Sequence, residues 1–317
     1  MDIISRDDRL IHAIETIRSE LPSVVIKPDE PMVNHTTFKV GGPVFAMLFP
    51  ESAKKLKEIC GILDRYDITP FIIGNGSNIL ADDKKLDYIV IKTSNIKDIL
   101  LLDTEASVKQ KYRDIIVDAG AQLSGAAVFA YENGLTGLEF AHGIPGTAGG
   151  AIVMNAGAYG REIKDVVIST TVYVEKTGSR ELTAAENEFS YRQSRFSKTN
   201  EIVLSAVIRL EKGNKESIKN KIDDFNSRRK KSQPLEFPSC GSIFKRPEEG
   251  YAAAYIEQAG LKGYKIGGAQ ISEKHAGFII NRGDASFTDI IKLIEHVQEV
   301  VLKRSGVKLE LEAKILS

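Results

Sequence analysis

A glycine-rich stretch near the middle of the chain, residues 143–160, has the composition of a loop that binds a ligand through its backbone. Glycine occurs in it at positions 143, 146, 149, 150, 157 and 160. Because glycine has no side chain, a flat or charged ligand can approach its amide groups directly. Thr147 is the one hydroxyl of the first turn and no lysine is present, which excludes a phosphate loop of the Gly-Lys-Ser/Thr type. The stretch suits a large flat ligand with a pyrophosphate, and a tight packing turn between two elements is an equally good explanation.

A second candidate ligand loop follows the short apolar segment 71–73. The sequence Gly74-Asn75-Gly76-Ser77-Asn78 offers successive amides and a hydroxyl at the end of a predicted strand, which suits a pyrophosphate. It is not the dinucleotide-binding fingerprint, because no Rossmann helix pattern and no acidic residue after a second strand accompany it. Asn-Gly is also a strong hairpin signal, and taken alone the segment favours a hairpin turn.

Three further segments carry residues that could do chemistry. Residues 188–196 crowd polar and aromatic side chains without a helical or strand period, which is typical of a functional loop. Residues 228–231 are Arg-Arg-Lys-Lys, most often a solvated helix face and otherwise a place where one or two cations meet phosphates. Residues 234–247 contain three prolines around Gly241-Ser242, and alone they favour a turn in which the serine bonds its own backbone.

The composition limits the classes of function. The chain has 317 residues, about two domains, with 43 basic and 43 acidic residues and a formal net charge of zero. This balance gives no reason to expect nucleic acid or an acidic membrane as a partner. The two cysteines, Cys60 and Cys240, and the histidines lack metal-site or disulfide spacing, so we expect no metal. The charged start of the chain and the lack of a long apolar run predict a cytoplasmic protein.

The elements that must position these segments follow from hydrophobic periodicity. We expect helices over residues 7–21, 52–66, 121–132, 215–231, 251–259 and 286–303. We expect strands over 45–49, 71–73, 88–92, 99–102, 115–118, 166–174, 202–210 and 307–316, and a short strand ending in a Gly-Gly-Pro turn over 34–43. The charged helix after Lys212 is the expected domain boundary.

Taken together, the motifs resemble those of the UDP-N-acetylenolpyruvoylglucosamine reductase (MurB) family, in its shorter type II form. The resemblance rests on residues 34–42, 74–78, 143–160, 191–196 and 238–247, with support from 274–281 and 309–312, all in the family's order. It covers the chain from about residue 30 onward. It implies a flavoenzyme that reduces UDP-N-acetylglucosamine enolpyruvate to UDP-N-acetylmuramate in peptidoglycan precursor synthesis, with non-covalent FAD and with NADPH as co-substrate.

The same resemblance implies an α+β architecture. A two-lobed FAD-binding domain of the vanillyl-alcohol-oxidase (PCMH) type is expected over residues 30–212, and a smaller α+β substrate-binding domain over 213–317. Residues 1–29 would be a helical extension, and the closing strand could pack back on the FAD domain. The expected partner is a small UDP-sugar, with no nucleic acid, membrane or obligate protein partner.

By the resemblance, the family's catalytic residues fall on Ser242, Arg192 and Glu312. The expected FAD-binding residues are Gly74, Asn75, Gly76, Ser77, Asn78, Gly143, Ile144, Pro145, Gly146, Thr147, Gly149, Gly150, Asn155 and Gly157. The expected substrate-binding residues are Tyr191, Arg229, Lys245 and Arg246. Arg246 and Gly277 occupy positions where many members have asparagine.

The residue types fit this chemistry. Reduction of an enol ether beside a carboxylate puts negative charge on the adjacent carbon and the carboxylate, and an arginine such as Arg192 matches a carboxylate in two-pronged geometry. Ser242 would deliver the proton, and Lys245 or another cation would favour its alkoxide. Glu312 would act protonated, or through a water or a neighbouring cation. The structural alternatives are a surface ion pair for Arg192 and a solvent-facing strand position for Glu312, with Glu310 as its control.

Two other functions remain open at this level. One is a different FAD-dependent oxidoreductase of the same fold, against which the residues Arg192, Ser242 and Glu312 argue. The other is a non-catalytic nucleotide-sugar binding protein, which would need no flavin. An RNA-binding function resting on residues 228–231 is weaker, because the charge is balanced and no aromatic residues interleave the cations.

Overall fold

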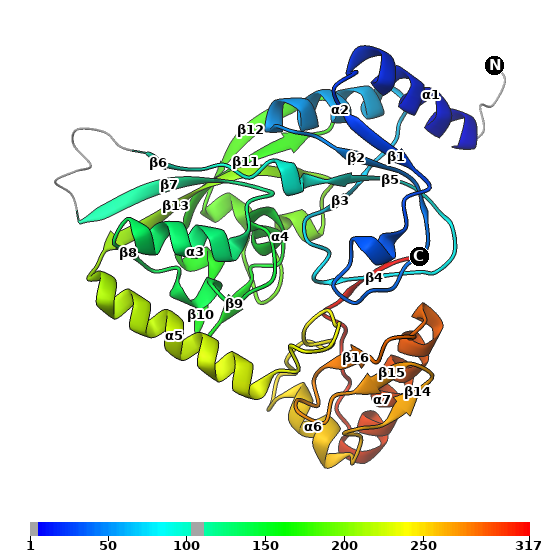
Figure 1. Ribbon diagram of the computed structural model, residues 1–317, viewed down its shortest axis with the longest axis vertical. Helices are drawn as coiled ribbons and strands as arrows, with labels where there is room; N and C mark the ends of the chain where they lie inside the picture. Colours follow the sequence, from blue (N-terminus) through cyan, green and yellow to red (C-terminus); the bar gives the residue numbers. More distant parts are fainter. Residues whose placement is uncertain (1–5, 103–110) are drawn as a thin grey trace. The chain divides into compact units, whose positions relative to one another are not determined.

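The computed structural model describes residues 6–102 and 111–317, which form two compact units. The first comprises the described residues of 1–28, 45–74 and 87–227. The second comprises 29–44, 75–86 and 228–317. The chain therefore enters the second unit twice before its last crossing, which falls between Ser227 and Arg228 inside helix α5 (Lys215–Ser232). Figure 1 follows this path.

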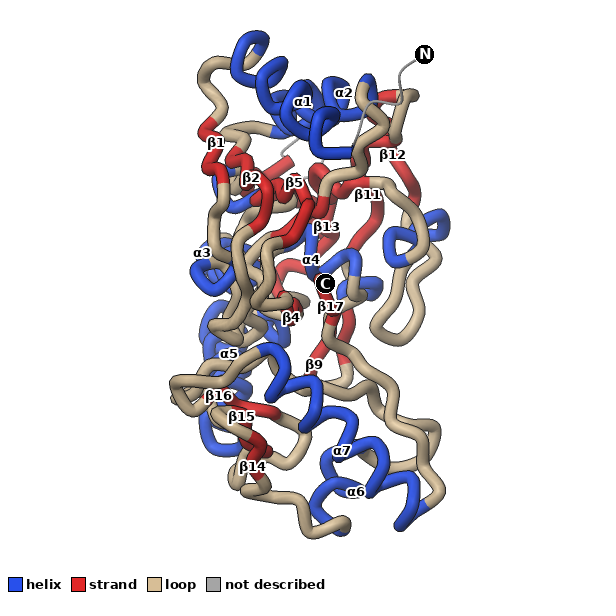
Figure 2. Tube along the Cα trace, turned by 90° about the vertical axis from the view of Figure 1, so that its right-hand side faces the viewer, coloured by secondary structure: helices blue, strands red, loops and turns tan. Residues whose placement is uncertain are grey.

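One part of the first unit is a mixed four-stranded sheet covered by two helices. Its strand order is β1 (Val25–Pro28), β2 (Val44–Phe49), β5 (Leu86–Lys92) and β3 (Phe71–Ile73). Helices α1 (Arg6–Glu20) and α2 (Ala53–Arg65) lie side by side over it, as Figures 1 and 2 both show. Their apolar faces bury Leu10, Ile17, Leu56 and Ile59 in one core with sheet residues. Amphipathic periodicity thus decides which face each helix buries.

The larger part of the first unit is an antiparallel sheet. Its order is β12 (Gly178–Thr183), β11 (Val167–Val174), β13 (Ile202–Lys212), β7 (Tyr112–Asp118) and β6 (Ile99–Leu102), with β8 (Leu135–Thr136) also on β13. Helices α3 (Leu123–Glu132) and α4 (Ala148–Val153) share its core. Small residues such as Ala126, Ala127 and Ala151 let these helices approach the sheet closely. The hairpin β9 (Gly157–Ala158) and β10 (Arg161–Glu162) follows α4.

The second unit is built on a three-stranded antiparallel sheet, β14 (Lys265–Ile266), β15 (Ala269–Ile271) and β16 (Ile279–Asn281). Helices α6 (Ala252–Gln258) and α7 (Phe287–Ser305) share its core, which also takes in Phe38 and Leu80 from the two early segments. The closing strand β17 (Lys314–Leu316) pairs in parallel with β4 (Ile79–Ala81), and Figure 2 shows the two side by side.

Most of the predicted elements are confirmed within one to three residues at each end. The Ser52 side chain accepts a hydrogen bond from the Lys55 amide and begins α2 as expected. Cys60 is buried on that helix, and burial raises the pKa of its thiol far above the usual value. Ser286 caps α7 in a reciprocal capping box with Asp289.

Two predictions from local sequence are wrong. Residues 34–43 do not form a strand, because Lys39 and Gly41 have positive φ angles of 58° and 125° that break an extended run. Residues 74–78 are not a hairpin turn, because β3 pairs with β5 and β4 pairs with β17 rather than with each other. Of the predicted closing strand over 307–316, only Lys314–Leu316 is a regular strand.

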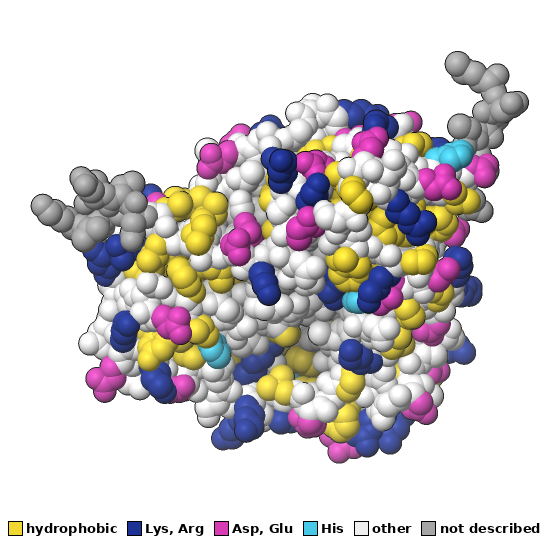
Figure 3. All heavy atoms as spheres, turned by 45° about the horizontal axis from the view of Figure 1, so that its top comes forward, with side chains coloured by type: hydrophobic (Ala, Val, Ile, Leu, Met, Phe, Trp, Pro, Cys, Tyr) yellow, Lys and Arg dark blue, Asp and Glu magenta, His cyan; other side chains and the backbone are white. Residues whose placement is uncertain are grey.

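A charged partner, a membrane or a metal ion would each require a particular feature of the described residues. On the face shown in Figure 3, basic and acidic side chains are interspersed among the described residues, in keeping with the balanced composition. Over residues 6–102 and 111–317, no helix combines the length and apolarity needed to cross a bilayer. Within the same ranges, no group of three or more His, Cys, Asp or Glu could hold a metal ion.

Candidate active site

In the first unit, Gly74 at the start of one glycine-rich loop packs against Thr147 of the other. A Cβ placed on Gly74 would lie only 2.2 Å from Oγ1 of Thr147, so Gly74 and Thr147 pack with no room for a side chain between them. Thr147 is buried, and its hydroxyl accepts a hydrogen bond from the Gly150 amide at the start of α4. The loops that sequence reasoning assigned to one ligand are therefore neighbours, although 72 positions separate their first contacting residues.

The first turn of α4 presents bare backbone. Gly149 packs tightly, since a Cβ there would lie 2.9 Å from the Cβ of Ala119. Gly150 is exposed, and a Cβ there would meet only Thr147 Oγ1, at 3.6 Å. The preceding turn, Gly143 to Gly146 with Ile144 and Pro145, is partly exposed. One glycine thus serves packing, whereas its neighbour leaves the backbone open to a ligand.

In the second unit, the turn over residues 34–43 holds the other half of the 74–78 loop. The amide of Thr37 donates to Gly76 O at 3.2 Å, and Gly76 packs against the His35 carbonyl, where a Cβ would lie at 2.1 Å. Gly76 has a φ of +61°, a conformation for which glycine is best suited. The Asn78 side chain donates to Glu312 O at 3.1 Å, which ties this loop to the last segment of the chain.

These loops fit FAD by their chemistry. The exposed backbone of Gly150 at the start of α4 suits a flat ring system and a pyrophosphate. Close packing accounts for the missing side chains at Gly74, Gly76 and Gly149 and leaves the exposed Gly150 unexplained.

Arg192 lies at the tip of a tight turn in the first unit. Ser190 and Gln193 exchange two backbone hydrogen bonds of 3.0 and 3.2 Å, which leaves Tyr191 and Arg192 as the turn residues. Arg192 has a φ of +54°, an uncommon conformation for a non-glycine residue that costs on the order of 1 kcal/mol. The turn holds Arg192 in this conformation while Tyr191 is exposed beside its guanidinium, 5.1 Å from the ring centroid.

A network of side chains fixes the Arg192 guanidinium. Its Nη2 donates to Gly157 O at 3.0 Å, and its Nη1 lies 3.8 Å from a carboxylate oxygen of Glu162. Glu162 also accepts from Asn155 at 3.1 Å and pairs with Lys164 at 2.7 Å. Asn155 is fully buried and donates to Ser190 O at 2.9 Å, so it connects the Arg192 turn to the β9–β10 hairpin.

The Asn155 side chain is hydrogen-bonded to protein groups at both its nitrogen and its oxygen. Its Nδ2 bonds Glu162 and Ser190, and its Oδ1 accepts from the Lys164 amide at 3.0 Å. These protein partners hold the side chain in place, and a contact of Asn155 with FAD stays a prediction. Gly157 is required at the same place, because a Cβ there would lie 2.4 Å from Arg161 O.

Ser242 and Glu312 lie on neighbouring extended segments of the second unit. The Glu312 amide donates to Ile243 O at 2.9 Å, and the Lys245 amide donates to Glu310 O at 2.8 Å. On the other side, Ser242 pairs with Phe278 in the bridge that continues from β16. Ser242 is exposed and Glu312 half-buried, and the ladder places Glu312 opposite Ile243, the residue that follows Ser242.

Glu312 and Glu310, the carboxylate that serves as its control, have different surroundings. The Glu310 carboxylate pairs with Lys245 Nζ at 3.2 Å and is exposed. Lys245, expected to help Ser242 or bind substrate, is thus engaged with Glu310.

Burial raises the pKa of the Cys240 thiol to about 12, with a smaller contribution from the Glu312 carboxylate nearby. The thiol therefore stays protonated and takes no part as a nucleophile.

The two departures from the family pattern have local explanations. Arg246 stacks on Tyr251, with 4.2 Å between the guanidinium carbon and the ring centroid, and donates to Gly250 O. A Cβ at Gly277 would lie 3.0 Å from His275 Cε1, so an asparagine there requires the ring to shift. His275 itself accepts from the Gly277 amide, and burial lowers its pKa.

The remaining predicted residues are distributed as follows. Arg192 and Tyr191 belong to the first unit, whereas Ser242, Glu312, Lys245 and Arg246 belong to the second. Arg229 lies half-exposed in the last turn of α5. Sequence reasoning missed Glu162 and Tyr251, the partners of Arg192 and Arg246. Neither has a local signal, because a glutamate after a glycine turn and a tyrosine before a helix are common on any surface.

Two family models match this chain. A general FAD-binding-domain family matches residues 45–181, and the C-terminal domain of UDP-N-acetylenolpyruvoylglucosamine reductase matches residues 233–316. The fold and the glycine loops thus define a flavoprotein with a separate C-terminal domain.

Relatives of the same kind extend over almost the whole chain. The UDP-N-acetylenolpyruvoylglucosamine reductase of Caldanaerobacter subterraneus is 49% identical over 91% of this chain and 92% of its own. That of Limosilactobacillus reuteri is 41% identical over 95% and 98%. The crystal structure of the Thermus caldophilus enzyme, 30% identical, superposes with a TM-score of 0.77 over 93% of this chain and 99% of that one. The chain belongs to the UDP-N-acetylenolpyruvoylglucosamine reductase family.

Proposed function

We propose that this chain reduces UDP-N-acetylglucosamine enolpyruvate to UDP-N-acetylmuramate with NADPH and FAD, as the names of its relatives indicate. The observation that carries the proposal is the hydrogen-bonded ladder that joins the segment of Ser242 to the segment of Glu312, the residues to which the family's proton donor and carboxylate correspond. The carboxylate of Glu310 on the same segment is instead paired with Lys245.

The glycine loops would hold the cofactor. Gly150 would offer its exposed backbone, and Gly74, Gly76 and Thr147 would belong to the same site. Asn75, Ser77, Asn78, Gly143, Ile144, Pro145 and Gly146 would complete the set. Bound FAD supplies the hydride. We propose that Asn155, Gly149 and Gly157 serve this site by shaping the backbone.

Arg192 would bind the enolpyruvyl carboxylate. Its planar guanidinium matches a carboxylate in two-pronged geometry, and it stabilises charge that develops on the substrate. The contacts to Gly157 O and Glu162 orient the fork before substrate arrives, so little rotamer entropy is lost on binding. Tyr191, Arg229, Lys245 and Arg246 would bind the sugar and diphosphate.

Ser242 would donate a proton to the substrate carbon that bears the developing charge. Its exposed hydroxyl is free of the buried core that holds its neighbours Ile243 and Phe244. Glu312 would act in its protonated form or through a water, since a bare carboxylate beside that charge is repelled.

The domain assignment and setting remain part of this proposal. We place the FAD-binding domain over residues 30–212 and the substrate-binding domain over 213–317, with 29–44 and 75–86 contributing to the core of the second unit. We also expect a cytoplasmic enzyme that acts on a small UDP-sugar without an obligate protein partner, in keeping with its balanced charge.

The test is an anaerobic absorbance experiment on the purified protein. We expect a flavin band that bleaches with NADPH and returns when UDP-N-acetylglucosamine enolpyruvate is added. A flavin that bleaches and ignores this substrate would indicate another oxidoreductase of the same fold. A protein that takes up no FAD on reconstitution would be a nucleotide-sugar binding protein instead.

A further inference from the structure

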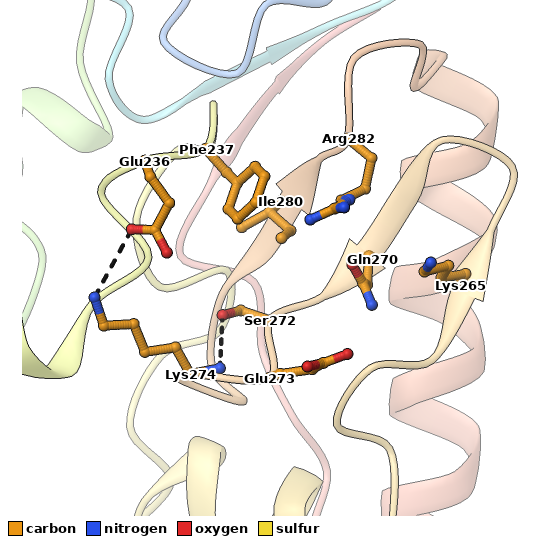
Figure 4. Close-up of a pocket in the computed structure, with 9 residues that line it drawn as sticks. All are labelled: Glu236, Phe237, Lys265, Gln270, Ser272, Glu273, Lys274, Ile280 and Arg282. Atoms are coloured by element: carbon orange, nitrogen blue, oxygen red, sulfur yellow. Dashed lines mark hydrogen bonds and ion pairs between the residues drawn. The ribbon is translucent and has the colours of Figure 1, made fainter.

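A cavity of about 340 Å³ lies on one face of the three-stranded sheet of the second unit (Figure 4). The register aligns Lys265, Gln270 and Ile280 across β14, β15 and β16. Because side chains alternate along a strand, Ala269 and Ile271 enter the core shared with α7, and Gln270 and Ile280 face the opposite side. The segment before Pro238, held to β16 through the Asn281 amide, supplies the far wall.

Cations without ionic partners converge in this cavity. Figure 4 shows the guanidinium of Arg282 turned toward Ile280 and Phe237, and the ammonium group of Lys265 turned toward Gln270. Among the described residues, neither forms an ion pair, whereas Lys274 on the opposite wall lies 3.8 Å from Glu236 and donates to Lys230 O. The positive charges of Arg282 and Lys265 both favour the binding of an anion near the buried Gln270 amide.

The Arg282 guanidinium is held in a way that leaves its donors available. It stacks on Phe237, with 4.6 Å between its central carbon and the ring centroid. Stacking covers the face of the planar group, whereas its N–H donors point outward in the plane. Phe237 and Ile280 also form an apolar wall beside these donors.

Gln270 is a polar side chain built into the floor. It is 4% exposed, and its Nε2 donates to Gly263 O at 3.1 Å, which fixes the orientation of the amide. Glu273 approaches the same place, because both it and Gln270 lie within 4 Å of a Cβ on Gly263. The charges of Lys274 and Glu236 cancel each other. The positive charges of Lys265 and Arg282 exceed the single negative charge of Glu273 by one, so the lining of the cavity carries a net charge of +1.

We propose that this cavity binds a small oxyanion, a phosphate ester or a carboxylate, carried on an apolar body. The anionic group would lie between Arg282 and Lys265 over Gln270, and the body would lie against Phe237 and Ile280. The site is separate from the Ser242–Glu312 ladder and does not depend on the proposed reaction. Its volume is within the range of small-molecule sites, roughly 300–1,000 Å³.

The chain contains no tryptophan, which allows a local test. A Phe237→Trp variant of the full-length, FAD-loaded protein would place a single tryptophan on the cavity wall and keep the stacking on Arg282. We expect its fluorescence to change saturably with phenyl phosphate or benzoate, and the one that binds identifies the oxyanion. Inorganic phosphate should bind about tenfold more weakly, because it buries no ring.

Charge variants in this background decide the assignment. Arg282→Gln should raise the Kd about tenfold, whereas Lys262→Gln, which removes a cation paired with Glu257 outside the cavity, should change it less than about twofold. Glu273→Gln should lower the Kd, a gain that a misfolded variant cannot produce.

Several results would overturn the proposal. They are the absence of saturable change with either probe, equal effects of Arg282→Gln and Lys262→Gln, and weaker binding in Glu273→Gln. Displacement of the probe by saturating UDP would place the fluorescence change in the substrate site and would also refute a separate cavity site.

Discussion

Arg192 in the first unit and the Ser242–Glu312 pair in the second are held by different kinds of contact. Arg192 depends on side chains, because Glu162 and the buried Asn155 connect its strained turn to the β9–β10 hairpin. Ser242 and Glu312 depend on the main chain, because hydrogen bonds from the amides of Glu312 and Lys245 join their segments. A side-chain network fails when one member is changed, whereas a backbone ladder survives most substitutions.

This difference has a functional reason. A carboxylate-binding arginine must present its fork at a defined angle, which contacts around the guanidinium, such as Gly157 O and Glu162, impose on a long flexible group. A serine hydroxyl is bonded directly to Cβ, so placing the Cα of Ser242 nearly places its reacting atom.

The largest effect is expected for Ser242→Ala. The backbone ladder should persist, so FAD content and FAD reduction by NADPH should stay within about twofold of the parent protein. Return of electrons to the enolpyruvyl sugar should slow about 10³-fold, because the proton donor is lost. Stopped-flow absorbance separates the two half-reactions, and equal losses in both would rule out the proton-donor role.

Glu312→Gln should slow the same second half-reaction about 10²-fold. Glu310→Gln is its matched control, because it lies two residues away on the same segment and its carboxylate already pairs with Lys245. The control should slow the second half-reaction far less than Glu312→Gln does and shift the free energy of unfolding by less than about 1 kcal/mol. Similar kinetic losses in both variants would mean that the ladder does not single out Glu312.

Asn155→Ala should lower the free energy of unfolding by about 2 kcal/mol, because it leaves the partners of a fully buried amide unsatisfied. Asn133→Ala is the control, since Asn133 is half-buried and makes one side-chain bond, to Phe129 O. It should cost less than about 1 kcal/mol. Urea unfolding of the FAD-loaded protein measures both, and an equal cost would contradict the bracing role.

Glu162→Gln should have the smallest effect, about a tenfold loss in kcat/KM with FAD content and fold preserved. The neutral amide keeps the shape and removes the charge that orients Arg192. Glu188→Gln, which removes a carboxylate 4.0 Å from the neighbouring Arg195, should be silent. Steady-state kinetics on both variants provides the measurement, and an unchanged Glu162→Gln enzyme would show that the turn alone holds Arg192.

Much of the fold could be predicted from local pattern. The 3.6-residue period placed α2 and α7, and runs of β-branched residues placed β11 and β13, because those elements bury one face or stripe wherever they pack. The failures lie where conformation depends on distant partners. Residues 34–43 read as a strand, yet their glycines pack against residues 81 and 83, and residues 74–78 read as a hairpin, yet their flanking strands pair elsewhere.

By itself the sequence determined the kinds of groups available: glycine loops for a flat cofactor, an arginine for a carboxylate, and a serine and glutamate for proton transfer. The tertiary structure decided which groups are neighbours. It placed Gly74 against Thr147, Glu312 opposite Ile243, Glu162 near Arg192, and Lys265 across from Gln270. The physical reason is that residue type sets the chemistry of a side chain, whereas contacts between residues far apart in sequence arise only when the chain buries its apolar surface.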